Sequence, residues 1–175
     1  MVAERRLVLI RHAKSAYPHG VPDHERPLAG KGRRHALAAG RWLLTEGPRI
    51  SLALCSDATR ARHTWEIIHA ELLEAGIDVP TTQEPDLYGA EPEEVVELVQ
   101  AVPADVATVA VIGHEPTMSG VVKLLAGPGS DADMLAAASA KFPTSGIAVL
   151  HFRGAAWPDL HPAGARLESL VKPRH

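Results

Sequence analysis

The stretch that decides the fold is residues 7–18, LVLIRHAKSAYP. Its apolar run, residues 7–10, predicts a short buried strand that ends abruptly in Arg11 and His12. In open α/β sheets, ligands bind at the carboxyl ends of the strands. Arg11 offers a planar fork of hydrogen-bond donors, and His12 offers a nitrogen nucleophile that is largely neutral near pH 7. The stretch therefore favours a phosphate-binding strand end, although two polar surface residues after a strand would give the same pattern.

Strands and helices alternate along the rest of the chain. Residues 16–28 contain three prolines and one glycine and are expected to form a loop over the strand end. Apolar spacing predicts further strands at residues 50–55, 81–84, 108–112, 147–152 and 165–171. Helices are expected at residues 30–46, 92–102, 116–125 and 130–141, and from a Ser56-Asp57 N-cap to residue 72. This order implies one α/β domain over residues 1–175, a three-layer α/β/α sandwich with a mostly parallel central sheet.

The composition is that of an ordinary globular protein. Of the 175 residues, 46% are hydrophobic and 22% are charged, and the formal net charge is −3. This charge gives no basic footprint for nucleic-acid binding, and no apolar stretch approaches the ~20 residues that span a bilayer. The single cysteine, Cys55, excludes an internal disulfide framework. We therefore expect a cytoplasmic protein with no nucleic-acid or membrane partner, and the sequence does not indicate its oligomeric state.

Three strand-to-helix junctions carry groups that suit a phosphate. The first has Arg11 and His12, the second places Arg60 in the first turn of a helix, and the third has His114 directly after a strand. If the three strands are neighbours in the sheet, two arginines and two histidines converge on one electropositive cup. Taken singly, each histidine could be structural and Arg60 could face solvent.

Five segments of the chain resemble the histidine phosphatase superfamily, in the branch that includes cofactor-dependent phosphoglycerate mutases. LVLIRHAKS (7–15) resembles the RHG signature of that family. RPLAGKG (26–32), CSDATRARHT (55–64) and VIGHEPTMSG (111–120) resemble its later segments in the same order. The short chain, with no insertion between residues 84 and 92, and the segment FPTSGIAVL (142–150) look most like the SixA-type phosphohistidine phosphatases.

This resemblance implies a function and a set of site residues. His12 matches the nucleophile that takes the phosphoryl group, and Arg11, Arg60 and His114 match the residues that hold the phosphate oxygens. Lys14 is expected among the substrate-binding residues at the rim. The resemblance implies no metal and no cofactor, because the cationic cup stabilises the charge of the transferring phosphoryl group. The expected partner is a phosphorylated substrate, such as a protein that carries phosphohistidine.

Two positions depart from the family pattern. Ala13 stands where the signature has glycine, which is tolerable only where the backbone avoids positive φ. Gly89 stands where mutases and many phosphomonoesterases carry an acidic glutamate. An alkoxide leaves poorly without a general acid, whereas the imidazole of phosphohistidine, with a conjugate-acid pKa of about 6.5, can leave already protonated. The pattern therefore favours phosphohistidine as substrate, unless a carboxylate elsewhere supplies the acid: Asp23, Glu25, Asp86 or Glu91.

Other functions are weighed against this reading. The closest enzymatic alternative is a broad-specificity phosphomonoesterase of small molecules on the same fold. A non-enzymatic alternative is a module that binds phosphate or phosphoproteins without turnover. A cysteine phosphatase built on Cys55 would need arginine at position 61, which is alanine. A metal site is disfavoured because the remaining histidines lack the spacing of metal ligands.

Overall fold

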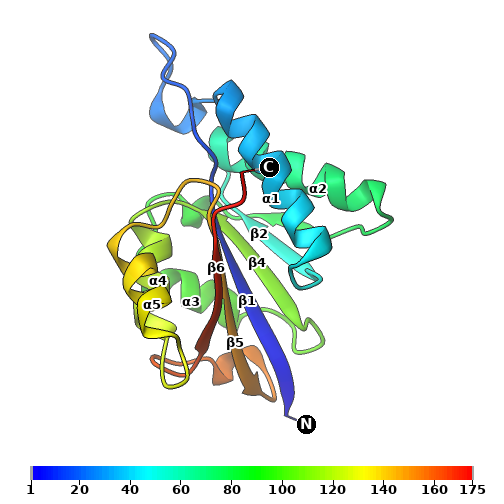
Figure 1. Ribbon diagram of the computed structural model, residues 1–175, viewed down its shortest axis with the longest axis vertical. Coiled ribbons are helices and arrows are strands. Elements are labelled where there is room, and N and C mark those ends of the chain that lie inside the picture. The colour runs from blue at the N-terminus through cyan, green and yellow to red at the C-terminus, as the bar shows by residue number, and fades with distance from the viewer. Residues whose placement is uncertain (1, 175) are drawn as a thin grey trace.

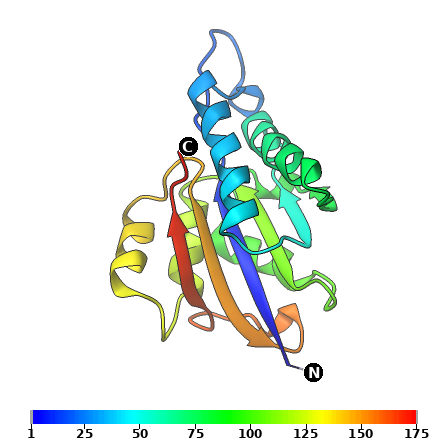
Figure 2. The same cartoon turned by 45° about the vertical axis from the view of Figure 1, so that its right-hand side comes forward.

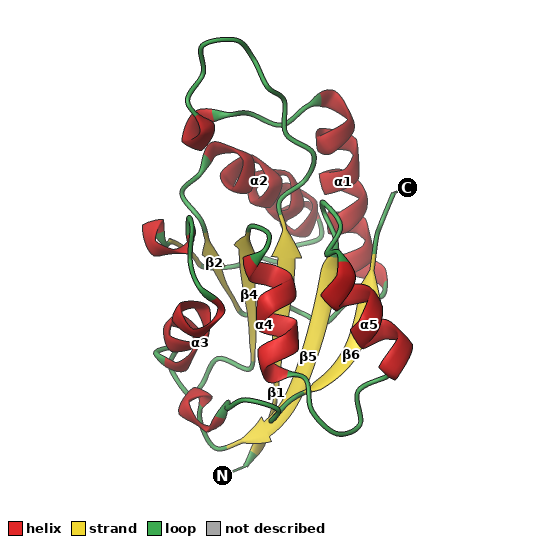
Figure 3. Ribbon diagram, turned by 90° about the vertical axis from the view of Figure 1, so that its left-hand side faces the viewer, coloured by secondary structure: helices red, strands yellow, loops and turns green. Residues whose placement is uncertain are grey.

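The fold is a central sheet covered by helices on both faces, as the computed structural model describes for residues 2–174 (Figure 1). The strands are β1 (Ala3–Arg11), β2 (Leu52–Cys55), β3 (Thr81–Gln83), β4 (Thr108–Gly113), β5 (Ile147–Gly154) and β6 (Arg166–Val171). The main helices are α1 (Gly30–Thr45), α2 (Thr59–Glu74), α3 (Pro92–Gln100), α4 (Thr117–Leu125) and α5 (Ala132–Ala140). Helices α1 and α2 cover one face, and α3, α4 and α5 cover the other (Figures 2 and 3). This arrangement confirms the predicted three-layer α/β/α sandwich.

The strand order brings the three predicted junctions together. The order across the sheet is β3-β2-β4-β1-β5-β6. Strand β4 runs parallel to both β1 and β2, with Arg11 opposite Gly113 and Cys55 opposite Ile112. Strand β5 pairs antiparallel with β1, and β6 pairs antiparallel with β5. The carboxyl ends of β1, β2 and β4 therefore meet at one edge, so the condition for a shared cup is fulfilled.

The apolar run of β1 is buried on both faces of the sheet, which is why it lacks polar alternation. Leu7 and Leu9 belong to the core beneath α3 and α4, whereas Val8 and Ile10 belong to the core beneath α1 and α2. All four side chains are fully buried. Successive side chains of a strand point to opposite faces, so one four-residue run joins the sheet to both helical layers.

Two sequence expectations about element ends were wrong. Strand β1 begins at Ala3, because the buried Arg5 side chain donates to the carbonyls of Ala104, Gly154 and Ala155 and so fits inside the sheet. Because the residues at the start of the strand are charged, the apolar pattern of the sequence did not indicate this extension. Helix α2 begins at Thr59, and its N-cap is Ala58 rather than Ser56-Asp57. The Ser56 hydroxyl contacts His114 instead, and the Asp57 carboxylate lies 2.8 Å from Nε2 of His24.

Two smaller differences concern the ends of β2 and α5. Strand β2 begins two residues later than expected, and α5 is shorter at both ends. Its N-cap is Asp131, whose side chain accepts a hydrogen bond from the Met134 amide. Among residues 2–174, no helix has the length and apolar character needed to cross a membrane.

The segment after β1 lies in tight contact with the first turn of α1. The Ala29 amide donates to the Lys14 carbonyl at 2.9 Å, and a Cβ on Gly32 would lie 2.0 Å from that same oxygen. The contact is made by backbone, which cannot rotate away as a flexible side chain does. Position 32 therefore requires glycine for close approach, and the contact fixes the loop that follows His12.

We expect Gly32→Ala to destabilise the protein by about 1–3 kcal/mol, the usual range for overpacking. Gly30→Ala is the matched control, because its Cβ would meet only the Arg34 guanidinium at 3.8 Å. Alanine has the higher helix propensity, so the control should be neutral or slightly stabilising. Urea unfolding of both variants measures the difference. Equal stabilities would contradict the role of the Lys14 contact.

Candidate active site

The structure places all the predicted site residues around one cavity of about 220 Å³. Arg11 and His12 come from the end of β1, Arg60 from the first turn of α2, and His114 from the residue after β4. Lys14 also lines this cavity, which we call the cup. Sequence reasoning did not single out several further lining residues: Ser15, Tyr17, Arg26, Glu115 and Thr144. Arg26 lies in the RPLAGKG segment, and the resemblance of this segment to the family could have identified Arg26 as a site residue.

The backbone of His12 is fixed from two neighbouring strands. Its amide donates to the Gly113 carbonyl at 3.0 Å, and its carbonyl accepts from the Ser145 amide at 3.1 Å. Ser145 is buried and has a φ of 54°, the left-handed conformation that directs its amide to His12. The next residue, Ala13, does not have a positive φ. The substitution of alanine for the signature glycine is therefore free of backbone strain here.

A short chain of hydrogen bonds joins this strand end to α2. The Ala13 amide donates to the Thr64 hydroxyl at 2.9 Å, and that hydroxyl donates to the Arg60 carbonyl at 2.7 Å. Thr64 is fully buried. The hydroxyl can donate and accept at once, so one side chain positions both the His12 loop and the first turn that carries Arg60.

The His12 imidazole is held in a single tautomer. Its Nδ1 lies 2.7 Å from the Ala13 carbonyl, and because a carbonyl only accepts, Nδ1 carries the proton and Nε2 keeps its lone pair. Burial lowers the pKa of His12 to about 3, and the positive charges of Arg60 and Arg11 act in the same direction. The ring is therefore neutral at physiological pH and can act as a nucleophile through Nε2.

His114 lies beside His12, with ring centroids 5.3 Å apart. Its Nε2 is 2.8 Å from the Ser56 hydroxyl, so the residue expected to cap a helix instead orients this ring. Burial lowers the pKa of His114 to about 4, with Arg60 the next contribution. His114 is accordingly a neutral hydrogen-bonding group, and the positive charge near the cup comes from arginine and lysine.

Three buried nitrogens of the predicted site residues have no hydrogen-bond partner among residues 2–174. They are Nε of Arg11, Nε of Arg60 and Nδ1 of His114. Leaving a buried donor unpaired costs about 1–3 kcal/mol, so such groups are uncommon and tend to mark functional positions. All three residues line the cup, so these nitrogens belong to side chains that a bound anion would contact.

Asp23, on the loop at residues 16–28, occupies the outer side of Arg60. Its carbonyl accepts from Nη1 of Arg60 at 2.7 Å, and Oδ2 accepts from Nη2 at 3.1 Å. The Tyr88 hydroxyl donates to the same Oδ2, and Arg26 donates to Oδ1 at 3.0 Å. The Tyr88 hydrogen bond is the largest of the effects that lower the pKa of Asp23. Asp23 is therefore an ionised acceptor and not a proton donor in this structure.

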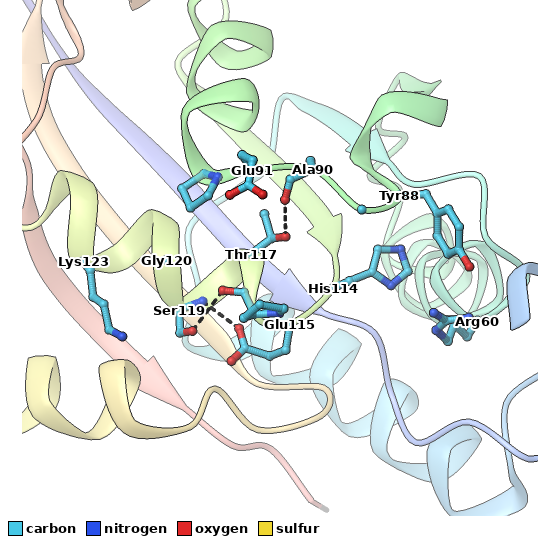
Figure 4. Close-up of a pocket in the computed structure, with 13 residues that line it drawn as sticks. Arg60, Tyr88, Ala90, Glu91, His114, Glu115, Thr117, Ser119, Gly120 and Lys123 are labelled. Carbon is cyan, nitrogen blue, oxygen red and sulfur yellow. Dashed lines mark hydrogen bonds between the residues drawn. The ribbon is translucent and has the colours of Figure 1, made fainter.

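A larger groove of about 650 Å³ continues from Arg60 and His114 along the start of α4. Figure 4 shows Tyr88, Arg60 and His114 at one end of this groove and Lys123 at the other. Of the carboxylates considered as acids from the sequence, Glu91 lines the groove, whereas Glu25 and Asp86 line neither it nor the cup. Glu115, which the sequence reasoning missed, lines both and accepts from the Ser119 amide at 2.7 Å. Gly89, with a φ of 75°, contributes no acid.

Cys55 is unsuited to nucleophilic catalysis. Its side chain is buried at the end of β2, and burial raises the pKa of the thiol to about 12. A thiol in this state is protonated at physiological pH, whereas the thiolate is the nucleophile. The structure thus gives no support to a cysteine phosphatase.

The lowered pKa of His12 predicts a pH dependence of stability. Between about pH 6.5 and pH 4, the unfolded chain binds a proton at His12 that the folded protein does not, so stability falls as the pH falls. His12→Asn removes this term and should reduce the dependence by about one proton, or about 1.4 kcal/mol per pH unit. Urea unfolding across this pH range measures the slope. His19→Asn, at an exposed loop histidine, is the control, and an equal slope change in both variants would contradict the assignment.

The contact between Asp23 and Arg60 predicts competition with an anionic ligand. In Asp23→Ala, Arg60 loses its carboxylate partner, so orthophosphate should bind about two- to fivefold more tightly, as expected for an ion pair worth up to about 1 kcal/mol. Calorimetric titration with orthophosphate measures the affinity. Asp86→Ala removes the same charge from an exposed position that lines neither cavity. If Asp86→Ala bound orthophosphate more tightly by a similar factor, the effect would come from the change in net charge and not from the contact with Arg60.

Comparison with known proteins identifies the family. Residues 7–108 match the family model of the histidine phosphatase superfamily, branch 1. An uncharacterized protein of Mycobacterium tuberculosis is 47% identical over 166 residues, 94% of this chain and 100% of that protein. The structure of a candidate phosphohistidine phosphatase SixA from Nakamurella multipartitia is 36% identical, with a TM-score of 0.84 over 99% of this chain and 98% of that one. A 2,3-bisphosphoglycerate-dependent phosphoglycerate mutase of Beijerinckia indica is 41% identical over 86 residues, 46% of this chain and 40% of that protein. The chain belongs to branch 1 of the histidine phosphatase superfamily.

Proposed function

We propose that this protein is a phosphohistidine phosphatase that acts on a histidine-phosphorylated protein or peptide. The observation that carries the proposal is a buried, neutral His12, with its Nε2 lone pair available, in a cup that has cationic donors and whose neighbouring Asp23 carboxylate is held ionised. The similarity to the Nakamurella SixA structure over nearly the whole chain supports it.

The proposed reaction has two transfer steps. In the first, Nε2 of His12 attacks phosphorus in line, an Nε2–P bond forms, and the P–N bond of the substrate breaks. The leaving imidazole is already protonated on its other nitrogen and departs neutral. In the second, water attacks phosphorus, the Nε2–P bond breaks, and orthophosphate leaves while His12 regains its lone pair. Arg11, Arg60 and His114 hold the phosphoryl oxygens through both steps, which suits a transition state stabilised by position and charge.

The protonation states fit this chemistry at each residue. A neutral His12 can attack without first losing a proton to a separate base. A neutral His114 carries one ring proton, and its unpaired Nδ1 is available for a phosphoryl oxygen. The unpaired Nε groups of Arg11 and Arg60 are available in the same way. Each group has a hydrogen bond to gain on phosphate binding, so binding and transition-state stabilisation use the same donors.

The carboxylates near the cup favour a P–N over a P–O bond. Asp23 is held ionised by Tyr88, Arg26 and Arg60, and Gly89 lacks a carboxylate. Glu115 lines the cup, and its carboxylate accepts from the Ser119 amide at the start of α4. Hydrolysis of an alkyl phosphate would need an acid to protonate the departing oxygen, whereas a protonated phosphoimidazole carries its own proton. A module that only binds phosphate would not need a nucleophile with a free Nε2 lone pair beneath its anion.

A phosphomonoesterase is the second candidate, and the position of Asp23 is the observation that favours it. A phosphate on Arg60 would displace the Asp23 carboxylate from the hydrogen bond with Nη2 of Arg60, which helps to keep the pKa of Asp23 low. The freed carboxyl group would then lie beside the leaving oxygen and could protonate it. Under this alternative, Asp23→Asn should abolish alkyl-phosphate hydrolysis but leave phosphohistidine hydrolysis intact.

A side-by-side assay tests the proposal. The substrates are a phosphohistidine peptide, p-nitrophenyl phosphate and an alkyl phosphate, each with wild type, His12→Ala, Asp23→Asn and the control His19→Ala. We expect phosphohistidine to be the best substrate, and His12→Ala to lose activity by about a thousandfold or more, as for removal of a nucleophile. Acid-labile, base-stable phosphate should be trapped on the wild type only. Equal or faster turnover of the alkyl phosphate by a route that needs Asp23 would identify a phosphomonoesterase, and no turnover of any substrate would favour a binding module.

A further inference from the structure

A second groove opens beside the cup, apart from the one in Figure 4. It has a volume of about 590 Å³ and lies between the end of β1, the α5–β5 connection and the residues that follow β6. We call it the basic groove and define it by its five cationic residues, Arg11, Lys14, Lys141, Lys172 and Arg174. None of these elements lines the groove of Figure 4, so the cup has a separate opening on each side.

The basic groove concentrates positive charge in a protein whose net charge is −3. No aspartate or glutamate lines it. Within the described part of the chain, none of its five cations forms an ion pair with a carboxylate, whereas six other arginines do: Arg6, Arg26, Arg41, Arg60, Arg62 and Arg166. Neighbouring like charges repel, so a cluster of cations with no carboxylate among the residues that line its groove favours the binding of an anion.

Both arginines of the basic groove are held by neutral acceptors. Nη1 of Arg174 donates to the Ser145 hydroxyl at 2.7 Å, and its Nη2 donates to the Thr144 carbonyl at 3.2 Å. Nη1 of Arg11 donates to the Phe142 carbonyl at 2.7 Å. Burial lowers the pKa of each guanidinium from a very high value, and both remain charged. The guanidinium positions are thereby fixed while their charges stay free for a ligand.

The basic groove and the cup share a wall. Arg11, Lys14 and Thr144 line both cavities, so a molecule with a phosphoryl group in the cup reaches the groove directly. We infer that the basic groove binds a second anionic group of the substrate, and that this group is a carboxylate beside the phosphohistidine of an acidic protein segment. The inference rests on the proposed function for the identity of the substrate, but the anion site itself does not.

The residues of the groove suit an acidic segment. Lys14, Lys141 and Lys172 are exposed, and their flexible point charges can follow carboxylates that lie at varied positions along a chain. Arg11 is positioned to contact both the transferred phosphoryl group and the neighbouring anion. A substrate with acidic side chains next to the phosphohistidine would therefore bind more tightly than one with neutral neighbours.

The test uses a double variant with a charge-matched control. Lys141→Ala/Lys172→Ala removes two exposed lysines from the basic groove without touching the cup. Lys31→Ala/Arg153→Ala removes two exposed cations elsewhere, one on α1 and one on β5, and neither lines the cup or either groove. Inorganic tripolyphosphate serves as a linear polyanion long enough to leave the cup, and orthophosphate fills the cup alone. Calorimetric binding of both ions, and their inhibition of p-nitrophenyl phosphate hydrolysis, are measured on all three proteins.

We expect tripolyphosphate to bind the wild type at least about tenfold more tightly than orthophosphate, as for roughly two added charge-assisted contacts. In the groove variant, tripolyphosphate should lose most of its tighter binding, whereas the affinity for orthophosphate should stay nearly unchanged. The control variant should bind both ions as the wild type does. An equal loss in both double variants, or no advantage in the wild type, would overturn the anion site. Because binding is read by calorimetry, the result stands even if the protein turns over no phosphohistidine, which would refute only the proposed function.

A second arm identifies the source of the anion. Phosphohistidine peptides with aspartate or asparagine next to the modified residue are compared by KM and kcat. A lower KM for the aspartate peptide, lost in the groove variant and kept in the control, supports an acidic protein segment. Equal KM values together with a clear tripolyphosphate advantage would overturn that assignment and point to a small substrate with a second phosphate.

Discussion

The site depends on how the backbone of His12 is held. Its amide bonds the Gly113 carbonyl of β4, and its carbonyl bonds the Ser145 amide before β5. These two hydrogen bonds fix the nucleophile between its parallel and its antiparallel neighbour in the sheet. The central position of β1 is therefore a functional constraint as well as a folding one, because an edge strand would lack one of the two partners. Gly32 extends the constraint by letting α1 pack directly on the Lys14 carbonyl.

Burial and positive charge act together in the cup. Burial keeps His12 and His114 neutral, and the adjacent guanidiniums reinforce this by disfavouring a further positive charge. Hydrogen bonding and positive charge therefore come from different residues of the cup. The neutral imidazoles supply a lone pair and a hydrogen-bond donor, whereas Arg11 and Arg60 supply the positive charge. Asp23 balances Arg60 from the loop side through a partly buried contact, in which the Asp23 carboxylate is exposed and the Arg60 side chain is buried.

Two grooves with different linings adjoin the cup. One passes Tyr88 and His114 toward α4, and the other passes Arg11 toward the end of β6. Their lining differs in charge, since Glu91 and Glu115 lie in the first and no carboxylate lies in the second. Under the proposed function, phosphoryl transfer at a common cup can thus serve different substrates according to which groove holds the remainder of the molecule, as expected where specificity resides in loops around a fixed site.

The sandwich and four of the residues that line the cup could be predicted from the sequence, because an apolar run followed by Arg11-His12 is local information, and so are the junctions at Arg60 and His114. It misassigned Ser56 as a helix cap, because the partner of its hydroxyl lies 58 positions away in the chain. Only the tertiary structure decided that Asp23 bonds Arg60 and that the cations from three distant segments form the basic groove. The physical reason is that strand order and loop path set those distances, and a linear pattern of residue types carries neither.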